Sequence, residues 1–186
     1  MNSLELIVYT SIIVWVFPAI RHIKTEYAYY FLLLGIIDPL KLGIYYFLGT
    51  DIELVTIPFS LILIYSIIKS KISERFTLPI ILCIIFISII GYQISILIGI
   101  KLIAHVFILI FLFSRMIKIL LNDNKWDIHL LVICFYEFSI IFKNLHLSPD
   151  IIADTYFFHI TSIFQLGFGL FFAFFNHWSI SLNTKD

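Results

Sequence analysis

The stretch that decides the fold runs from Thr77 to Leu121, TLPIILCIIFISIIGYQISILIGIKLIAHVFILIFLFSRMIKILL. As one helix it would be about 66 Å long, roughly twice the hydrocarbon layer of a membrane. The run is continuously apolar, for example IILCIIFISII at 80–90, whereas a transmembrane β-strand alternates apolar and polar residues. We therefore predict two membrane-spanning helices that turn back at 99–101, with 91–93 as the competing turn.

The whole chain has the composition of a membrane protein. Of its 186 residues, 61% are apolar, 18% are aromatic and 13% are charged, and the mean hydropathy is +1.06. A soluble domain of this size could not bury so much apolar surface. Disordered chains are rich in charge and poor in aromatic residues, which excludes disorder.

The apolar runs predict an all-α integral membrane protein. A helix needs about 20 mostly apolar residues to cross a bilayer, and such runs lie at about 4–20, 27–48, 53–69, 77–98, 101–121, 128–144 and 151–175. Little chain remains between them for a soluble appendage. We expect a compact bundle of seven transmembrane helices that forms a single domain, 1–186.

The basic residues orient this bundle. Seven spans place Arg21, Lys24, Lys69, Lys71, Arg75, Arg115, Lys118, Lys125 and Lys185 on one side, and only Lys101 and Lys143 on the other. Cytoplasmic loops collect Lys and Arg, which predicts an external N-terminus and a cytoplasmic C-terminus. The frequent Ile, Phe, Lys and Asn residues indicate an AT-rich genome and favour a bacterial cytoplasmic (inner) membrane.

Several aromatic residues fall near the predicted cytoplasmic ends of the helices. Trp15 lies near the end of the first span, and Tyr27, Tyr29 and Tyr30 lie at the start of the second. Trp and Tyr are enriched at membrane–water interfaces. We predict that these side chains form an interfacial belt.

Three ionisable residues fall at similar depth in three different helices. Asp38, Glu137 and His159 each lie about 12–17 Å from the start of their spans at 1.5 Å per residue. Ionisable groups inside a membrane are costly and usually face the bundle interior or a water-filled cavity. The sequence therefore predicts that these three side chains meet near the middle of the membrane.

Two of these residues have possible partners. Lys41 follows Asp38 by three residues and lies on the same helix face, while Pro39 between them removes a backbone donor and is expected to kink the helix. Glu137 has no basic neighbour in sequence. It is expected either to stay protonated or to pair with Lys41 or His159.

The last span has a polar face. At 100° per residue, one sector holds Asp154, Thr155, His159, Thr161, Ser162 and Gln165. Such a face should point toward the bundle interior, where hydroxyl and amide groups can also join helices. Gly167 and Gly169 follow and would allow a neighbouring helix to approach closely.

The remaining histidines do not form a metal-binding motif. His105 and His146 should lie toward the outer side with Asp150 and Asp154, and a second set at the cytoplasmic side comprises His22, His129 and His177 with Asp127. Neither set has a short ligand spacing such as HExxH. We predict no cofactor and no metal, and the balance of 12 basic and 12 acidic residues predicts no nucleic-acid partner.

These features predict a polar cavity within the membrane. Its expected lining comprises Asp38, Lys41, Glu137, Asp154, His159, Ser162 and Gln165. We expect it to bind a small ligand or lipid, or to sense for a membrane or cytoplasmic protein partner. Proton-coupled transport, a lipid-active membrane enzyme and a structural subunit of a membrane complex are the alternatives, and the sequence favours a protein that is not an enzyme.

Overall fold

The computed structural model describes residues 3–48, 52–68, 80, 82–84, 87–88, 97–146, 155–175 and 179–181. The helices are α1 (Ser3–Arg21), α2 (Ala28–Leu48), α3 (Ile52–Ile68), α5 (Leu97–Asp123), α6 (Ile128–His146) and α7 (Thr155–Phe174). Two short strands, β1 (Lys125–Asp127) and β2 (Ser179–Ser181), pair antiparallel. The fold is all-α, as the sequence predicts.

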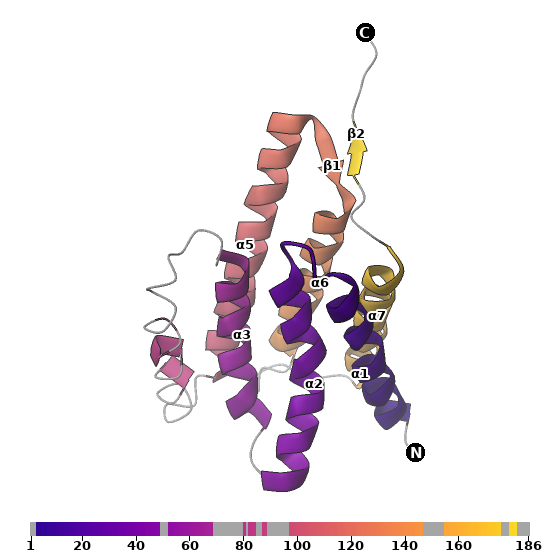
Figure 1. Cartoon of the computed structure of the whole chain (residues 1–186). Coiled ribbons are helices and arrows are strands. Elements are labelled where there is room, and N and C mark those ends of the chain that lie inside the picture. Colours follow the sequence, from indigo (N-terminus) through magenta and orange to yellow (C-terminus); the bar gives the residue numbers. More distant parts are fainter. Residues whose placement is uncertain are drawn as a thin grey trace.

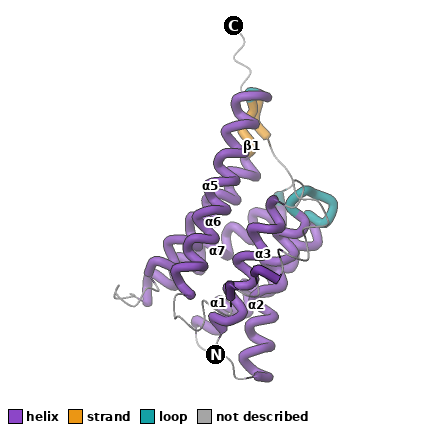
Figure 2. Tube along the Cα trace, turned by 90° about the vertical axis from the view of Figure 1, so that its left-hand side faces the viewer, coloured by secondary structure: helices purple, strands orange, loops and turns teal. Residues whose placement is uncertain are grey.

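The helices close into a ring. The main contacts join α1 to α2, α2 to α3, α3 to α5, α5 to α6, α6 to α7 and α7 back to α1. Figure 2 shows α1, α2 and α3 on one side and α5, α6 and α7 on the other. The side chains that face inward from this ring therefore come from every helix.

The start of α1 and the strand β2 lie at opposite ends of the ring (Figure 1). Helices α1, α3, α5 and α7 run upward in that view, and α2 and α6 run downward. Because α3 and α5 run in the same direction, the chain changes ends between Ile68 and Leu97. We call the end with β1 and β2 the upper end, and the opposite end the lower end.

Polar residues define the turn between α5 and α6. Asn124 follows the last residue of α5 with a φ of 51°, a left-handed conformation that asparagine tolerates well at a helix end. Its N–H donates to the carbonyl of Leu120 at 3.1 Å. Asp127 then caps α6, because its Oδ1 accepts the N–H of Leu130 at 3.0 Å.

Two helices are long and apolar enough to cross a membrane by length and composition alone. They cover 98–123 and 128–145. Shorter apolar helices in the described part of the chain cover Tyr9–Arg21, Thr56–Ile67 and His159–Phe174. These findings suggest a membrane protein and leave the number of spans to be tested.

The predicted turn at 99–101 is wrong. Helix α5 begins at Leu97 and continues through Gly99 and Lys101, and nothing within 4 Å crowds Gly99 or gives it a special role. The competing turn at 91–93 lies outside the described residues, as does most of the predicted span 77–98. Leu97 therefore starts its helix one turn earlier than the sequence indicated.

The predicted aromatic belt is largely wrong, because most of its members form the core. Trp15, Tyr27 and Tyr30 are buried, and only Tyr29 is exposed. The Trp15 ring lies 4.7 Å from the ring of Tyr136 and 6.3 Å from that of Phe172. These contacts join α1, α6 and α7 through their largest side chains.

Helix α7 presents the face that the sequence predicts. Thr161 and Ser162 are buried, while Ile160, Ile163 and Phe164 are exposed. The two glycines differ. A Cβ at Gly169 would lie 2.8 Å from Val14 Cγ1, so this glycine does allow α1 to approach, whereas the same expectation for Gly167 is wrong, since nothing lies within 4 Å of it.

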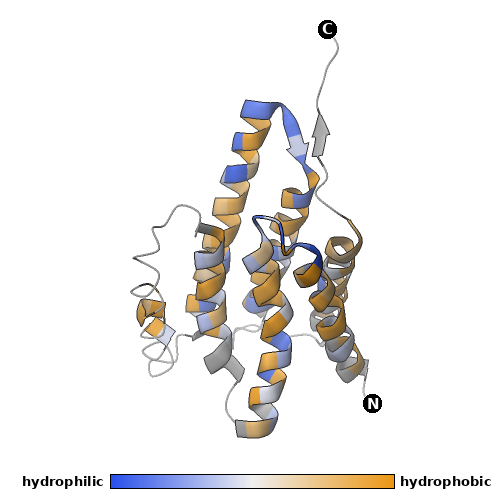
Figure 3. Ribbon diagram, viewed as in Figure 1, coloured by the Kyte–Doolittle hydropathy of each residue, from blue (hydrophilic) through white to orange (hydrophobic). Residues whose placement is uncertain are grey.

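The outer surface of the ring is strongly apolar (Figure 3). Large apolar side chains that are more than half exposed include Ile13, Phe17, Ile20, Phe47, Ile103, Ile110, Leu121, Phe135, Ile163, Phe164 and Phe174. Several polar side chains, by contrast, are buried inside the ring. This distribution is the reverse of the one that water favours.

Candidate functional site

A cavity of about 410 Å³ opens inside the helix ring. All six described helices contribute to its wall. Its polar and charged lining residues are Ser11, Asp38, Lys41, Thr56, Ser60, Lys101, His105, Tyr136, Lys143, Asn144, His159, Ser162 and Gln165. Apolar residues such as Leu34, Ile37 and Leu63 complete the wall, so the cavity suits a ligand with both a polar and an apolar part.

The charge of the cavity is positive. Three ammonium groups line it, from Lys41, Lys101 and Lys143, and the only carboxylate among its lining residues is that of Asp38. The Nζ atom of Lys41 lies 3.5 Å from Oδ1 of Asp38, which confirms the predicted pair within α2. Among the described lining residues, ammonium groups therefore outnumber carboxylates, which favours an anionic ligand.

Lys143 binds the polar face of α7. Its Nζ atom donates to Oγ of Ser162 at 3.0 Å and to Oε1 of Gln165 at 3.1 Å. These bonds position the ammonium group within the cavity wall. Ser162 and Gln165, which the sequence selects as lining residues, therefore both bind a lysine that was predicted at the outer end of the sixth span.

Two polar atoms of the wall lack a hydrogen-bond partner within the described part of the chain. They are Nδ2 of Asn144 and Nδ1 of His159, and both residues line the cavity. Buried polar groups without partners are rare and costly. A bound ligand that supplies a hydrogen-bond acceptor to Asn144 would remove part of this cost.

A hydrogen-bonded chain of buried side chains lies beside the cavity. Tyr30 donates its hydroxyl to Oε1 of Glu137 at 2.5 Å, and Nδ1 of His105 lies 2.7 Å from Oε2 of the same carboxyl group. On the other side of the His105 imidazole, Nε2 lies 3.3 Å from Oγ of Ser60. The chain therefore connects α2, α6, α5 and α3 in that order.

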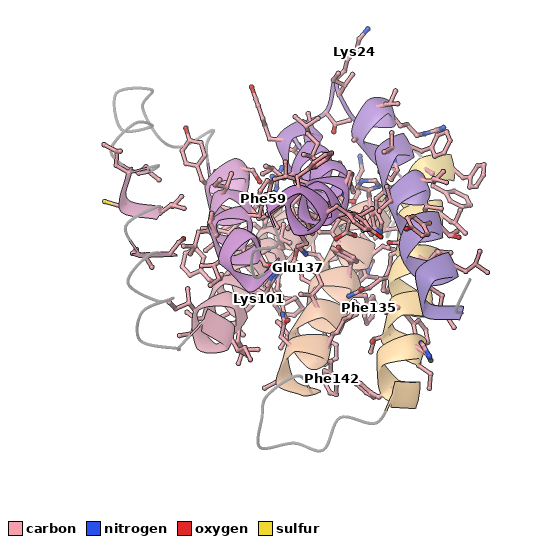
Figure 4. All side chains as sticks on the ribbon, turned by 90° about the horizontal axis from the view of Figure 1, so that it is seen from below. Lys24, Phe59, Lys101, Phe135, Glu137 and Phe142 are labelled. Carbon is pink, nitrogen blue, oxygen red and sulfur yellow. The ribbon has the colours of Figure 1, made fainter. Side chains whose placement is uncertain are left out.

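Glu137 is fully buried and lies near the middle of the ring when the molecule is seen from below (Figure 4). The expected partners Lys41 and His159 are both wrong, because the basic partner of Glu137 is His105. Glu137 itself is absent from the cavity lining, while His105 is part of it. The carboxylate of Glu137 thus lies behind the cavity wall and contacts His105, which does line the cavity.

The sequence-selected residues are distributed as follows. Asp38, Lys41, His159, Ser162 and Gln165 line the same cavity, Glu137 lies behind it, and Asp154 lies outside the described residues. Sequence analysis missed the roles of Tyr30, Ser60, Lys101, His105, Lys143 and Asn144. Lys101 and His105 are four residues apart on α5, and Lys143 and Asn144 are adjacent on α6, but no spacing in the chain links these two pairs with each other or with Tyr30 and Ser60.

His105 is the one missed residue for which a signal existed. Counted from the predicted span start at 101, it lies only one turn below the surface. Counted from the observed start at Leu97, it lies about 12 Å down the helix, at the depth assigned to Glu137. With the helix start placed at Leu97, His105 and Glu137 would have been predicted at the same depth and hence as possible partners.

The second histidine set lies near the upper end. His22, just after α1, donates from Nε2 to the carbonyl of Phe172 at 3.1 Å, and its ring lies 4.6 Å from that of Phe31 and 4.8 Å from that of His129. Burial lowers the pKa of His22, which keeps the ring neutral. Within the described ranges no group of three His, Cys, Asp or Glu side chains is arranged to hold a metal ion.

Comparisons with family models, with curated proteins and with solved structures gave no match for this chain. The chemistry of the site is therefore interpreted from its own geometry. It combines a cavity lined by three lysines, a partly apolar wall and a buried line of hydrogen-bonded side chains.

Proposed function

We propose that this chain is a seven-helix integral membrane protein whose cavity binds the anionic group of an amphiphile. The ligand class is a phosphate or carboxylate attached to an apolar tail. In this proposal the C-terminus lies in the cytoplasm, and the cavity opens toward the outer half of a bacterial cytoplasmic membrane.

The apolar outer surface supports the location in a membrane. Exposed aliphatic and aromatic side chains cover α1, α5, α6 and α7, and hydrophilic residues gather at the upper end of α5 and the turn into β1 (Figure 3). At about 25 cal/mol per Å², each large side chain moved from water into lipid contributes about 1.5–3 kcal/mol. A bilayer is the solvent that this surface fits.

The observation that carries the ligand class is the positive cavity. Lys41, Lys101 and Lys143 line it together, and Asp38 supplies one negative charge against them. Several ammonium groups that line one cavity attract an anionic group. Phosphate and carboxylate oxygens accept charge-assisted hydrogen bonds from lysine.

Binding by the purified protein in a neutral detergent tests this proposal. Dodecyl phosphate should bind and raise the unfolding temperature. Two further measurements distinguish the source of the anionic group. Stabilisation in nanodiscs that contain phosphatidylglycerol would indicate a lipid headgroup, and stabilisation by inorganic phosphate in detergent would indicate a free anion.

A pair of lysine variants provides the control. Lys143→Met removes one charged donor from the cavity and should weaken dodecyl phosphate binding about tenfold or more, since a hydrogen bond to a charged group contributes about 1.5–3 kcal/mol. Lys118→Met, at an exposed position of α5, should bind like the wild-type protein. Equal affinities for the two variants would contradict the proposal.

A further inference from the structure

Ser60, His105 and Glu137 come from three helices and form one hydrogen-bonded line. We infer that they are a catalytic triad that hydrolyses an ester bond of the amphiphile in the cavity. The inference rests on the proposed function, because the substrate must first occupy that cavity. Ser60 is the nucleophile, His105 is the general base and Glu137 is a positioning residue.

The distances fit these roles. Oγ of Ser60 lies 3.3 Å from Nε2 of His105, and Nδ1 on the opposite side of the ring lies 2.7 Å from Oε2 of Glu137. A nucleophile, a base and an orienting carboxylate in this order define a hydrolytic triad by geometry and role, on any fold. A distance slightly above 3.2 Å between nucleophile and base is common without substrate.

The carboxylate fixes the tautomer of the histidine. When Glu137 accepts the proton on Nδ1 of His105, Nε2 has a free lone pair that faces the hydroxyl of Ser60. The same hydroxyl also lies 3.1 Å from the carbonyl of Thr56. Rotation about one bond of Ser60 therefore moves its proton from that carbonyl to Nε2, which is the step that activates the serine.

The line ends at the cavity. Ser60, Thr56 and His105 are all lining residues, so the nucleophile and the base can reach a bound molecule. Glu137 lies behind them and is held from its other side by Tyr30. This order, from a nucleophile in the cavity wall to a carboxylate behind it, is the one that a positioning residue requires.

The reaction balances with water as co-reactant. Oγ of Ser60 attacks the acyl carbon while Nε2 of His105 takes its proton, the ester C–O bond breaks, and the leaving alcohol receives that proton. Water then attacks the acyl-serine while Nε2 of His105 takes a proton from it, and His105 passes that proton to Oγ of Ser60 as the carboxylic acid leaves. The cavity also carries donors for the negative oxygen of the intermediate, from Asn144 and the lysines.

An alkyl fluorophosphonate tests the nucleophile in the full-length protein in neutral detergent. The Ser60 oxygen should form a bond to phosphorus as the P–F bond breaks, fluoride leaves and His105 takes the proton. Mass spectrometry should find the adduct on Ser60. Ser60→Ala should abolish labelling, and Ser66→Ala should not.

Ser66 is a matched control on the same helix. It is buried like Ser60 and donates to a backbone carbonyl of the preceding turn, that of Leu63, at 2.7 Å. It is not one of the residues that line the cavity. Ser60→Ala and Ser66→Ala each remove one buried hydroxyl from α3, but only Ser60→Ala removes the proposed nucleophile.

Glu137→Gln separates positioning from folding. The amide oxygen can still accept from Tyr30, while the amide N–H donates to Nδ1 of His105. The histidine then carries its proton on Nε2 and cannot act as a base toward Ser60. Labelling should fall at least a hundredfold, although the unfolding temperature stays within a few degrees of the wild-type value, and Glu137→Asp should restore part of the rate.

Each outcome decides the inference. Labelling of Ser60→Ala at the wild-type rate, or an unlabelled wild-type protein that binds dodecyl phosphate, would overturn the triad and leave the proposed function standing. In the second case the polar line serves only to join helices. A wild-type protein that neither binds nor reacts would overturn both.

Discussion

At the scale of single residues, the molecule concentrates its polarity in a few enclosed positions. Glu137 is fully buried yet forms hydrogen bonds with two side chains, His105 and Tyr30. Burial of such groups is tolerated because both carboxylate oxygens have partners. Removal of one member leaves the others unsatisfied.

Glu137→Ala should therefore destabilise the protein far more than Glu137→Gln. The alanine leaves Tyr30 and His105 without their shared acceptor, and breaking such a buried pair costs about 3–5 kcal/mol. Thermal unfolding in neutral detergent measures the difference. Similar unfolding temperatures for the two variants would show that the carboxylate has little structural role.

His22 should make the stability depend on pH. Burial holds its pKa below the usual 6.5, and the charge of Arg21 lowers it further, against the opposing hydrogen bond to Phe172. Because the unfolded chain binds the proton more readily, stability is complete above pH 6.5 and falls as the pH drops through that value toward the lowered pKa.

The measurement compares unfolding temperatures at pH 7.5 and pH 5.5. We expect the wild-type protein to lose stability between them and His22→Gln to lose less, since glutamine keeps a donor for the carbonyl of Phe172 but does not titrate. An identical loss in both proteins would assign the effect to other groups.

At the scale of elements, close helix contacts depend on small residues at particular positions. A Cβ at Gly35 of α2 would lie 2.9 Å from the carbonyl oxygen of Trp15 and 3.2 Å from Cβ of Ala19. A backbone atom cannot move aside without shifting α1. Gly43 in the same helix has nothing within 4 Å of that position.

Gly35→Ala should destabilise the pair α1–α2, and Gly43→Ala should be neutral or slightly stabilising. Overpacking typically costs about 1–3 kcal/mol, whereas alanine at an open helical position gains about 1 kcal/mol over glycine. Unfolding temperatures of the two variants test this contrast. A Gly35→Ala protein as stable as the wild type would mean that α1 and α2 separate easily.

Sequence periodicity predicts individual helices better than it predicts their meeting points. It gave the inward face of α7 and the pair of Asp38 and Lys41, which both depend on local spacing. It failed for the start of α5. The sequence around Gly99 is continuously apolar, and this glycine lies inside the helix rather than at a turn, so nothing in the pattern marks where the helix begins. That error hid the depth of His105, and long-range pairs such as Ser60 with His105 have no local signature.

At the scale of the whole molecule, the open question is how many times the chain crosses the bilayer. The start of α1 and the end of α7 lie at opposite ends of the ring (Figure 1), which fits an odd number of crossings. Helix α5 has 27 residues and spans about 40 Å, so it extends beyond an about 30 Å hydrocarbon layer. The last turns of α5, which include Lys118, extend past this layer and lead into β1 at the upper end.

Reporter fusions should place the upper end in the cytoplasm. Green fluorescent protein fused after Asp186 should fluoresce, and alkaline phosphatase at the same position should be inactive. The same reporters after Leu48, where α2 ends at the lower end, should give the opposite result. Phosphatase activity at both positions would contradict seven crossings.

The three lysines around one cavity also bear on how the protein is prepared. A surfactant such as dodecyl sulfate or a sarcosinate has a negative head and a single alkyl tail, which is the shape and charge of the ligand that we propose for the cavity. Extraction in such a surfactant would fill the cavity before any assay began. Inactivity observed under those conditions would reflect occupancy by the solubilising agent rather than the properties of the chain.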